Sequence, residues 1–317
     1  MRRTPRLVSI TIAATALVAL SASLAGCSAA APTAAGSSAQ TNSGAAPIQI
    51  VASINVYGDI AAQIGGSEVS VTSIIDDPDK DPHDYQADAQ NQLALSKAQI
   101  VIENGGGYDD FVGAMLSSAK NTEATVLNAA DISGFDQNPA SGEFNEHLWY
   151  DMPTVSKVVE QLSTALTAAN PASAATFAAN AASFQAKLTT IEAAEAAAKT
   201  VAAGAGAAIT EPVPLYMLTA MGLTNKTPDA FSKAIEDGTD AAPTVLAETL
   251  SLFSSHAVAV LAYNSQTPGP QTDAVLNAAK SAGVAVVPVT ETLPAGDDFI
   301  RWMTANVTAI AAAVAGS

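Results

Sequence analysis

The chain has 317 residues, of which 49% are hydrophobic, so general disorder is excluded and about two domains are expected. Thirteen basic residues against thirty acidic ones give a formal charge of −17, which argues against binding to a nucleic-acid backbone. A single cysteine excludes an intramolecular disulfide framework and a cysteine-rich zinc site.

The beginning of the chain has the pattern of an export signal. Three arginines within the first six residues precede a short apolar stretch, and small residues follow it. The alternatives are a membrane-spanning helix, for which the stretch is short, and a signal that is cleaved without lipidation. The run from Leu24 to Cys27 resembles a bacterial lipobox. We therefore expect residues 1–26 to be a signal peptide and Cys27 to carry a lipid that anchors an extracytoplasmic protein to the cell membrane.

The rest of the chain divides by composition. Small and polar residues dominate up to Ala46, so we predict a lipidated flexible tether over 27–47. The remaining boundaries follow from the predicted elements described below, and they give an N-terminal lobe over 48–170, a linking helix over 171–200 and a C-terminal lobe over 201–317.

The first lobe alternates between apolar strands and helical segments. The patterns predict strands at 48–56, 69–75 and 99–103, another strand that begins at Ala124, and helices at 88–98 and 108–119. Alternation at this spacing favours βαβ units and a largely parallel sheet. The glycines at 105–107 follow a strand and precede a helix, so we interpret them as a tight turn.

The middle of the chain is helical from Pro153 to Lys199. Pro171 interrupts this pattern and suits the first turn of a new helix. That helix is rich in alanine, and its larger apolar residues form a stripe: Phe177, Phe184, Leu188 and Ile191. A helix over 172–199 would be about 42 Å long, enough to connect two lobes.

The second half returns to strand and helix alternation. The patterns predict strands at 207–210, 257–263 and 284–289, and helices at 213–221, 271–282 and 298–315. The fold class is therefore α/β, with two lobes that each contain a central, mostly parallel sheet flanked by helices, joined by a single long helix.

Four polar residues lie in predicted loops next to the ends of strands: His83, His147, Glu211 and Asp297. Ligands of α/β proteins bind at such positions. Two imidazoles and two carboxylates are a reasonable ligand set for a divalent transition metal ion. From spacing alone the signal is weak, and the alternative for each histidine is a surface or hydrogen-bonded side chain.

Several motifs resemble the metal-specific solute-binding proteins of zinc and manganese ABC importers. They are Asp81-Pro-His-Asp-Tyr85, the segment Leu95–Tyr108, the segment Asn145–Pro153, Thr210-Glu-Pro212, Val289-Thr-Glu-Thr292 and Gly296-Asp-Asp298. The resemblance spans about residues 48–315 in a consistent order. One departure is Glu146, which replaces the proline that usually precedes the second histidine.

The resemblance implies one metal ion, zinc or manganese, bound between the lobes. The implied ligands are His83 and His147 from the first lobe and Glu211 and Asp297 from the second. Asp298 replaces Asp297 if the last motif is displaced by one residue, and Glu291 is the alternative carboxylate.

The resemblance also implies a role in transport. We expect a protein that is not an enzyme, acts as a monomer and delivers its ion to a membrane permease, with no nucleic acid as partner. The alternatives are a surface adhesin or interaction lipoprotein and a zinc metallohydrolase, which would keep a metal position open for water.

Overall fold

The computed structural model describes residues 46–77, 85, 88–202 and 204–316. The predicted signal peptide, Cys27 and His83 lie outside these residues. The described residues fall into one compact unit, which contains both lobes. Among the described residues, no helix is both long enough and apolar enough to cross a membrane.

The first lobe contains a four-stranded parallel sheet in the order β2-β1-β3-β4. The strands are β1 (Ile48–Ile54), β2 (Val69–Ile75), β3 (Ile100–Glu103) and β4 (Thr125–Asn128). β1 is central and is almost wholly buried, as its continuous apolar sequence requires of a strand covered on both faces. The predicted parallel sheet is confirmed.

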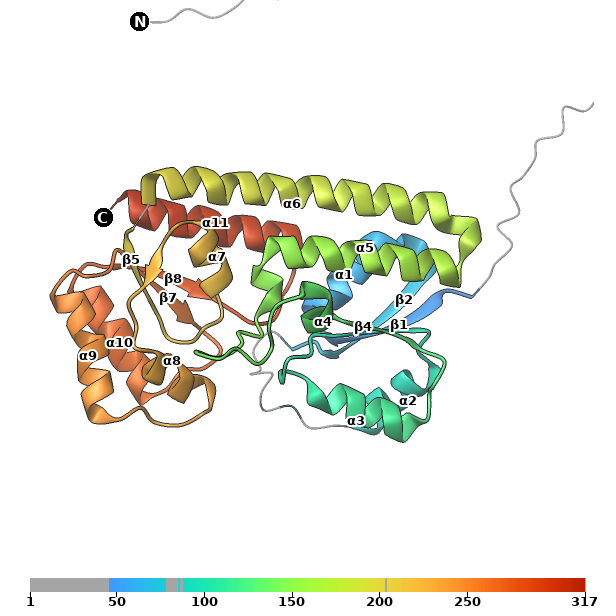
Figure 1. Cartoon of the computed structure of the whole chain (residues 1–317), viewed down its shortest axis with the longest axis horizontal. Helices are drawn as coiled ribbons and strands as arrows, with labels where there is room; N and C mark the ends of the chain where they lie inside the picture. The colour runs from blue at the N-terminus through green and yellow to red at the C-terminus, as the bar shows by residue number, and fades with distance from the viewer. Residues whose placement is uncertain (1–45, 78–84, 86–87, 203, 317) are drawn as a thin grey trace, which may run out of the picture. The chain divides into compact units, whose positions relative to one another are not determined.

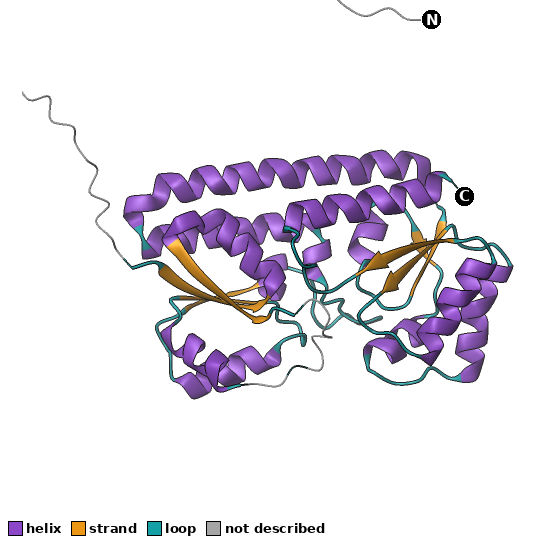
Figure 2. Ribbon diagram, turned by 180° about the vertical axis from the view of Figure 1, so that it is seen from behind, coloured by secondary structure: helices purple, strands orange, loops and turns teal. Residues whose placement is uncertain are grey.

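The helices of this lobe cover both faces of the sheet (Figure 2). They are α1 (Asn55–Gly65), α2 (Ala89–Lys97), α3 (Asp110–Ala119) and α4 (Ala129–Ser133). The strand predicted over 48–56 ends at Ile54, because α1 starts directly at Asn55 with no loop between. Ile60 and Ile64, four residues apart, bury the inner face of α1.

The second lobe repeats this topology, with a parallel sheet in the order β6-β5-β7-β8. Its strands are β5 (Gly206–Ile209), β6 (Thr224–Asn225), β7 (Val260–Asn264) and β8 (Ala285–Val289). Its helices are α7 (Leu215–Ala220), α8 (Asp229–Glu236), α9 (Pro243–Ser254) and α10 (Pro270–Ser281). The sequence patterns predict neither β6 nor α8 and α9, because Pro228, Gly238 and Pro243 interrupt the periodicity there.

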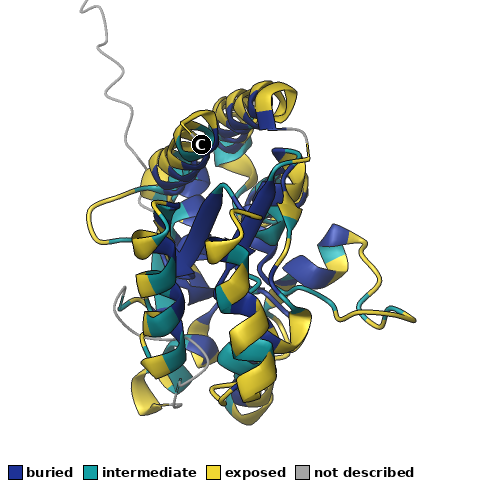
Figure 3. Cartoon of the chain, turned by 90° about the vertical axis from the view of Figure 1, so that its left-hand side faces the viewer, coloured by how far each residue is buried: buried dark blue, intermediate teal, exposed yellow. Residues whose placement is uncertain are grey.

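Three long helices accompany the two sheets: α5 (Met152–Ala169), α6 (Ala174–Ala202) and α11 (Phe299–Ala315). Of these, α6 links the lobes. α6 packs against α5 and α11, and it runs along both lobes (Figure 1). Its predicted apolar stripe is confirmed, since Phe177, Phe184, Leu188 and Ile191 are all buried. The outer helices show exposed faces, and buried strands lie inside them (Figure 3). The inner strands of the two sheets, β1, β3, β5 and β7, are almost wholly buried. The two-lobe α/β fold with a long linking helix is therefore confirmed.

Candidate metal site

Polar side chains gather where three strands of the second lobe end. Glu211 lies two residues beyond β5, Asn264 is the last residue of β7, and Glu291 lies two residues beyond β8. These strands are parallel neighbours in one sheet, so their carboxyl ends meet at the same edge. All three side chains are at least 98% buried.

Asn264 connects the two glutamates. Its Nδ2 atom donates to Glu211 Oε2 at 2.5 Å and to Glu291 Oε1 at 2.9 Å. Thr267 Oγ1 also donates to Glu211 Oε2, at 2.5 Å. Two carboxylates from different strand ends are therefore held next to each other by neutral donors.

His147 faces this pair from the first lobe. It precedes the short 3₁₀ turn η3 (Leu148–Tyr150), and its side chain is 1% exposed. Its Nε2 atom lies 3.8 Å from Glu291 Oε2 and has no hydrogen-bond partner among the described residues. The other ring nitrogen, Nδ1, lies 2.7 Å from Asn145 Oδ1. Because that oxygen can only accept, Nδ1 carries a hydrogen, and in the neutral ring Nε2 keeps the lone pair that a metal needs.

Aromatic side chains surround the imidazole. The rings of Trp149 and Tyr108 lie 5.3 and 6.0 Å from the His147 ring, both edge-on. Tyr108 Oη also donates to Glu291 Oε2 at 3.2 Å. The site is therefore shielded from water on this side, which strengthens electrostatic interactions within it.

Burial and negative charge dominate the electrostatics. Burial raises the pKa of Glu211 to about 7, and the nearby Glu291 adds to the increase, although Thr267 and Asn264 oppose it. Burial alone would lower the pKa of His147, but Glu291 and the more weakly acting Glu146 and Glu236 raise it above its usual value. A buried group with several carboxylates and one imidazole is stabilised by a bound cation.

Contacts between the lobes border the site. Asn145 Nδ2 donates to the Pro212 carbonyl at 3.2 Å, and Tyr216 Oη donates to the Asn145 carbonyl at 2.8 Å. Elsewhere on the border, the Asn55 side chain bonds both backbone groups of Leu293, at 3.0 and 2.8 Å. The loop that carries His147 is thus fixed against the loop that carries Glu211.

Of the four predicted ligands, His147 and Glu211 both neighbour Glu291: His147 Nε2 lies 3.8 Å from Glu291 Oε2, and Asn264 links Glu211 to Glu291. Asp297 lies apart from them: its side chain is 41% exposed, and its Oδ1 is 3.5 Å from Arg301 Nε. Asp298 caps α11, accepts from the Arg301 backbone and is 35% exposed. Both aspartates therefore serve the start of α11, and the carboxylate beside His147 Nε2 is that of Glu291. His83 lies outside the described residues.

Sequence reasoning missed two further groups. Asn264 was visible as a polar residue that ends an apolar strand, but its link to both glutamates depends on strand order. Glu236, at the end of α8, lies 3.9 Å from His147 Nδ1 and forms a possible metal-holding group with Glu146 and His147. The sequence patterns do not predict the helix that carries Glu236, so no signal in the sequence points to this residue.

Comparison with known proteins gives relatives for the chain. The iron-binding protein YfeA of Yersinia pestis is 26% identical over 146 residues, which are 46% of this chain and 47% of that protein. The manganese-binding lipoprotein MntA of Bacillus subtilis (strain 168) is 28% identical over 137 residues, or 41% of this chain and 43% of that protein. The chain thus matches somewhat less than half the length of either relative.

Solved structures share the fold over most of the chain. The periplasmic zinc-binding protein TroA from Treponema pallidum has a TM-score of 0.71 at 19% identity, covering 85% of this chain and 99% of that one. The solute-binding protein FpvC from Pseudomonas aeruginosa, in complex with Mn²⁺, has a TM-score of 0.70 at 19% identity, covering 86% and 99%.

A family model extends over almost the whole described part of the chain. The model of the zinc-uptake complex component A, periplasmic, matches residues 50–313. This range includes both lobes, the linking helix and every described residue of the candidate site. The chain therefore belongs to the ZnuA family of periplasmic zinc-uptake components.

Proposed function

We propose that this protein binds a divalent transition metal ion between its lobes and delivers it to the permease of an ABC importer. The observation that supports this most is His147 Nε2, a buried donor atom without a hydrogen-bond partner among the described residues. It lies 3.8 Å from the carboxylate of Glu291 in the other lobe, which Asn264 links to Glu211. Family membership supports the same role. The ion is the cargo, and no reaction is expected.

The proposed ligands are His147, Glu211 and Glu291, together with His83, which remains a prediction from the sequence motif. Glu291 takes the role that the motifs suggested for Asp297. It is fully buried beside His147, whereas Asp297 interacts with Arg301 at the surface. Glu291 also belongs to the Val289–Thr292 motif, so this assignment keeps the order of the family motifs.

We propose zinc or manganese as the cargo. Imidazole suits zinc, and carboxylate oxygen suits manganese, so the proposed set can hold either ion. The names of the relatives point the same way: TroA is described as zinc-binding and MntA as manganese-binding. The two proposed glutamate ligands offset the double charge of the ion.

The cellular setting follows from the first residues and from the family. We propose that Cys27 carries the lipid anchor, that the protein is held at the outer side of the cell membrane as a monomer, and that its partner is the importer's permease. Relatives of the chain are named as lipoproteins, which supports this arrangement.

Calorimetric titration with Zn²⁺ and Mn²⁺ tests the proposal. At a free ion concentration 100 times the dissociation constant, binding should stabilise the fold by about 2.7 kcal/mol and raise the melting temperature. His147→Ala and Glu291→Gln should each lower the affinity by about 100-fold or more, since even outer partners of metal ligands contribute 10- to 100-fold.

Asp297→Asn is the matched control, because it neutralises a carboxylate that also follows β8 but interacts with Arg301 at the surface. It should bind both ions as the unaltered protein does. The proposal would be rejected if neither ion bound. The assignment of Glu291 alone would be rejected if Asp297→Asn lost the ion and Glu291→Gln kept it.

A further inference from the structure

Every polar atom of the Asn264 side chain is engaged. The two hydrogens of Nδ2 go to Glu211 and Glu291, and Oδ1 accepts from the Gln266 backbone N–H at 3.1 Å. A backbone N–H can only donate, so this contact determines which end of the amide faces the carboxylates. The amide is thus oriented as a double donor between two glutamates that would otherwise repel each other.

Glu211 is held through one oxygen. Among the described residues, two donors bond its carboxylate, Asn264 Nδ2 and Thr267 Oγ1. Both reach the same atom, Oε2, and each lies 2.5 Å away. A carboxylate oxygen offers about two lone-pair directions. Two donors therefore occupy Oε2, and Oε1 is the atom of Glu211 that remains for a metal ion.

Gln266 ties the same loop to the Glu291 turn. Its Oε1 accepts from the backbone N–H of Glu291 at 2.5 Å, and its Nε2 donates to Thr292 Oγ1 at 2.8 Å. The loop from Asn264 to Thr267 thus hydrogen-bonds the side chain of Glu211. It also hydrogen-bonds both the side chain and the backbone N–H of Glu291. It forms one unit that sets the distance between the two carboxylates.

We propose that Asn264 and Thr267 are positioning residues that make Glu211 bind the ion through Oε1 alone. This inference rests on the proposed function and goes beyond it, because it states how many oxygens Glu211 offers to the ion. A carboxylate that is restricted to one oxygen keeps the coordination number low. Four-coordinate geometry is the arrangement that zinc adopts in protein sites, whereas larger oxygen-rich shells suit harder ions.

Co²⁺ is the probe for this inference, because its visible absorption is intense in four-coordinate sites and weak in six-coordinate ones. Absorption per bound Co²⁺ and Zn²⁺ affinity are measured for the unaltered protein, Asn264→Ala, Thr267→Val and Thr267→Ser. Thr267→Val keeps the shape of the side chain and removes the donor, and Thr267→Ser restores the donor. Thr249→Val is the control, since this buried threonine of the same lobe bonds the Val245 carbonyl of its own helix.

Asn264→Ala and Thr267→Val should weaken Zn²⁺ binding by about 10- to 100-fold, as changes to outer partners of metal ligands do. Both should also lower the Co²⁺ absorption, because the released Oε2 can then join the ion. Thr267→Ser and Thr249→Val should match the unaltered protein. Because Thr267 lies on a partly exposed loop, Thr267→Val should fold even if Asn264→Ala does not.

An unchanged Co²⁺ absorption in Asn264→Ala and Thr267→Val would overturn the inference, even if affinity fell. If Asn264→Ala failed to fold, an unchanged absorption in Thr267→Val alone would overturn it. The proposed function would stand in either case, provided that the unaltered protein bound Zn²⁺ and Glu291→Gln did not. Absence of binding by the unaltered protein would reject both ideas.

Discussion

At the residue scale, the turn after β3 shows how backbone conformation supports the site. Gly105, Gly106 and Gly107 all have positive φ, which confirms the predicted tight turn. The Asp109 carboxylate accepts from the backbone N–H groups of Asn104 and Gly105 at 2.6 and 2.7 Å. The turn leads directly to Tyr108, whose hydroxyl reaches Glu291. Glycine is needed here because the chain turns close to the site.

Gly105→Ala should destabilise the protein by about 2 kcal/mol or more. Its φ is +73°, and an added Cβ would lie 2.3 Å from the Asn128 side chain. Gly113→Ala is the matched control: it lies in α3 with open space around it, and should be neutral or stabilising by up to about 1 kcal/mol. Urea denaturation measures both, and equal effects would contradict the role given to Gly105.

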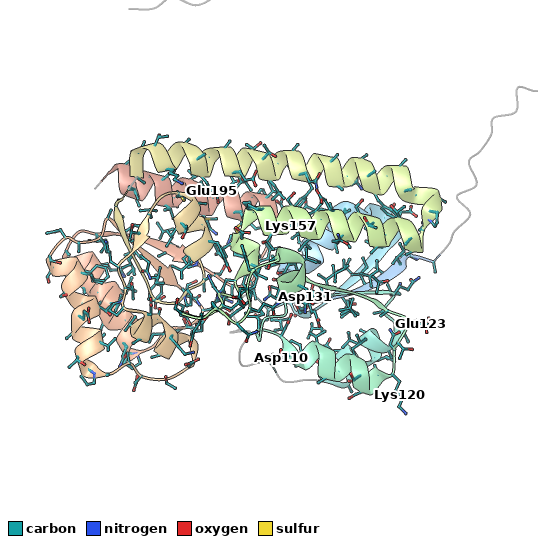
Figure 4. All side chains as sticks on the ribbon, viewed as in Figure 1. Asp110, Lys120, Glu123, Asp131, Lys157 and Glu195 are labelled. Carbon is teal, nitrogen blue, oxygen red and sulfur yellow. The ribbon has the colours of Figure 1, made fainter. Side chains whose placement is uncertain are left out.

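At the scale of elements, α6 combines an apolar stripe with one acidic exception. Glu195, labelled on this helix in Figure 4, is 5% exposed, and its Oε1 has no hydrogen-bond partner among the described residues. Burial raises the pKa of this carboxyl group from 4.5 to about 7, with Glu192 and Asp151 adding to the increase. The helix therefore carries, on its buried face, a carboxyl group that is costly to ionise.

Glu195→Gln should stabilise the protein at high pH only. Below about pH 4.5 the carboxyl is protonated in both the folded and the unfolded chain, so it has no effect. As pH rises to about 7, the unfolded chain ionises first and stability falls, and above about 7 the loss is constant. The variant does not lose this stability. Its free energy of unfolding should equal that of the unaltered protein at low pH and exceed it by about 1–2 kcal/mol at pH 8.

Urea denaturation at pH 5 and pH 8 measures this difference. Glu248→Gln is the control, because Glu248 lies on the exposed face of α9 and should change stability little at either pH. If Glu195→Gln gave the same advantage at both pH values, the ionisation of a buried carboxyl would not be the cause.

At the scale of the whole described unit, one apolar core extends through both lobes. A single cluster of buried residues includes Ile50 of β1, Leu188 of α6 and Val287 of β8. Tyr150 strengthens the connection, since its hydroxyl donates to the Thr290 carbonyl at 2.8 Å and its ring lies edge-on to Trp302. A second cluster lies within the C-terminal lobe.

The shared core predicts that the lobes unfold together. Urea denaturation should give one transition that coincides in far-UV circular dichroism and in tryptophan fluorescence, which reports Trp149 near the site and Trp302 in α11. Trp149→Phe and Trp302→Phe variants let each lobe be followed separately. Transitions at different urea concentrations would show that the lobes are independent.

The sequence predicted most of the framework because its signals are local. Strand β2 has the predicted bounds, and the stripe on α6 was readable from the spacing of Phe184, Leu188 and Ile191. Helix α1 was missed because the apolar run of β1 passes into it without a break. Local periodicity identifies an element well in its interior and poorly at its ends.

The sequence by itself determined two α/β lobes, a long linking helix and polar residues at strand ends. Only the tertiary structure decided which of these residues meet. Glu291 and Asp297 both follow β8, but the chain turns between them, so one faces His147 and the other faces Arg301. Asn264 bridges two glutamates because β7 lies between β5 and β8. Strand order and the path of a loop are non-local properties, and residue spacing along the chain does not encode them directly.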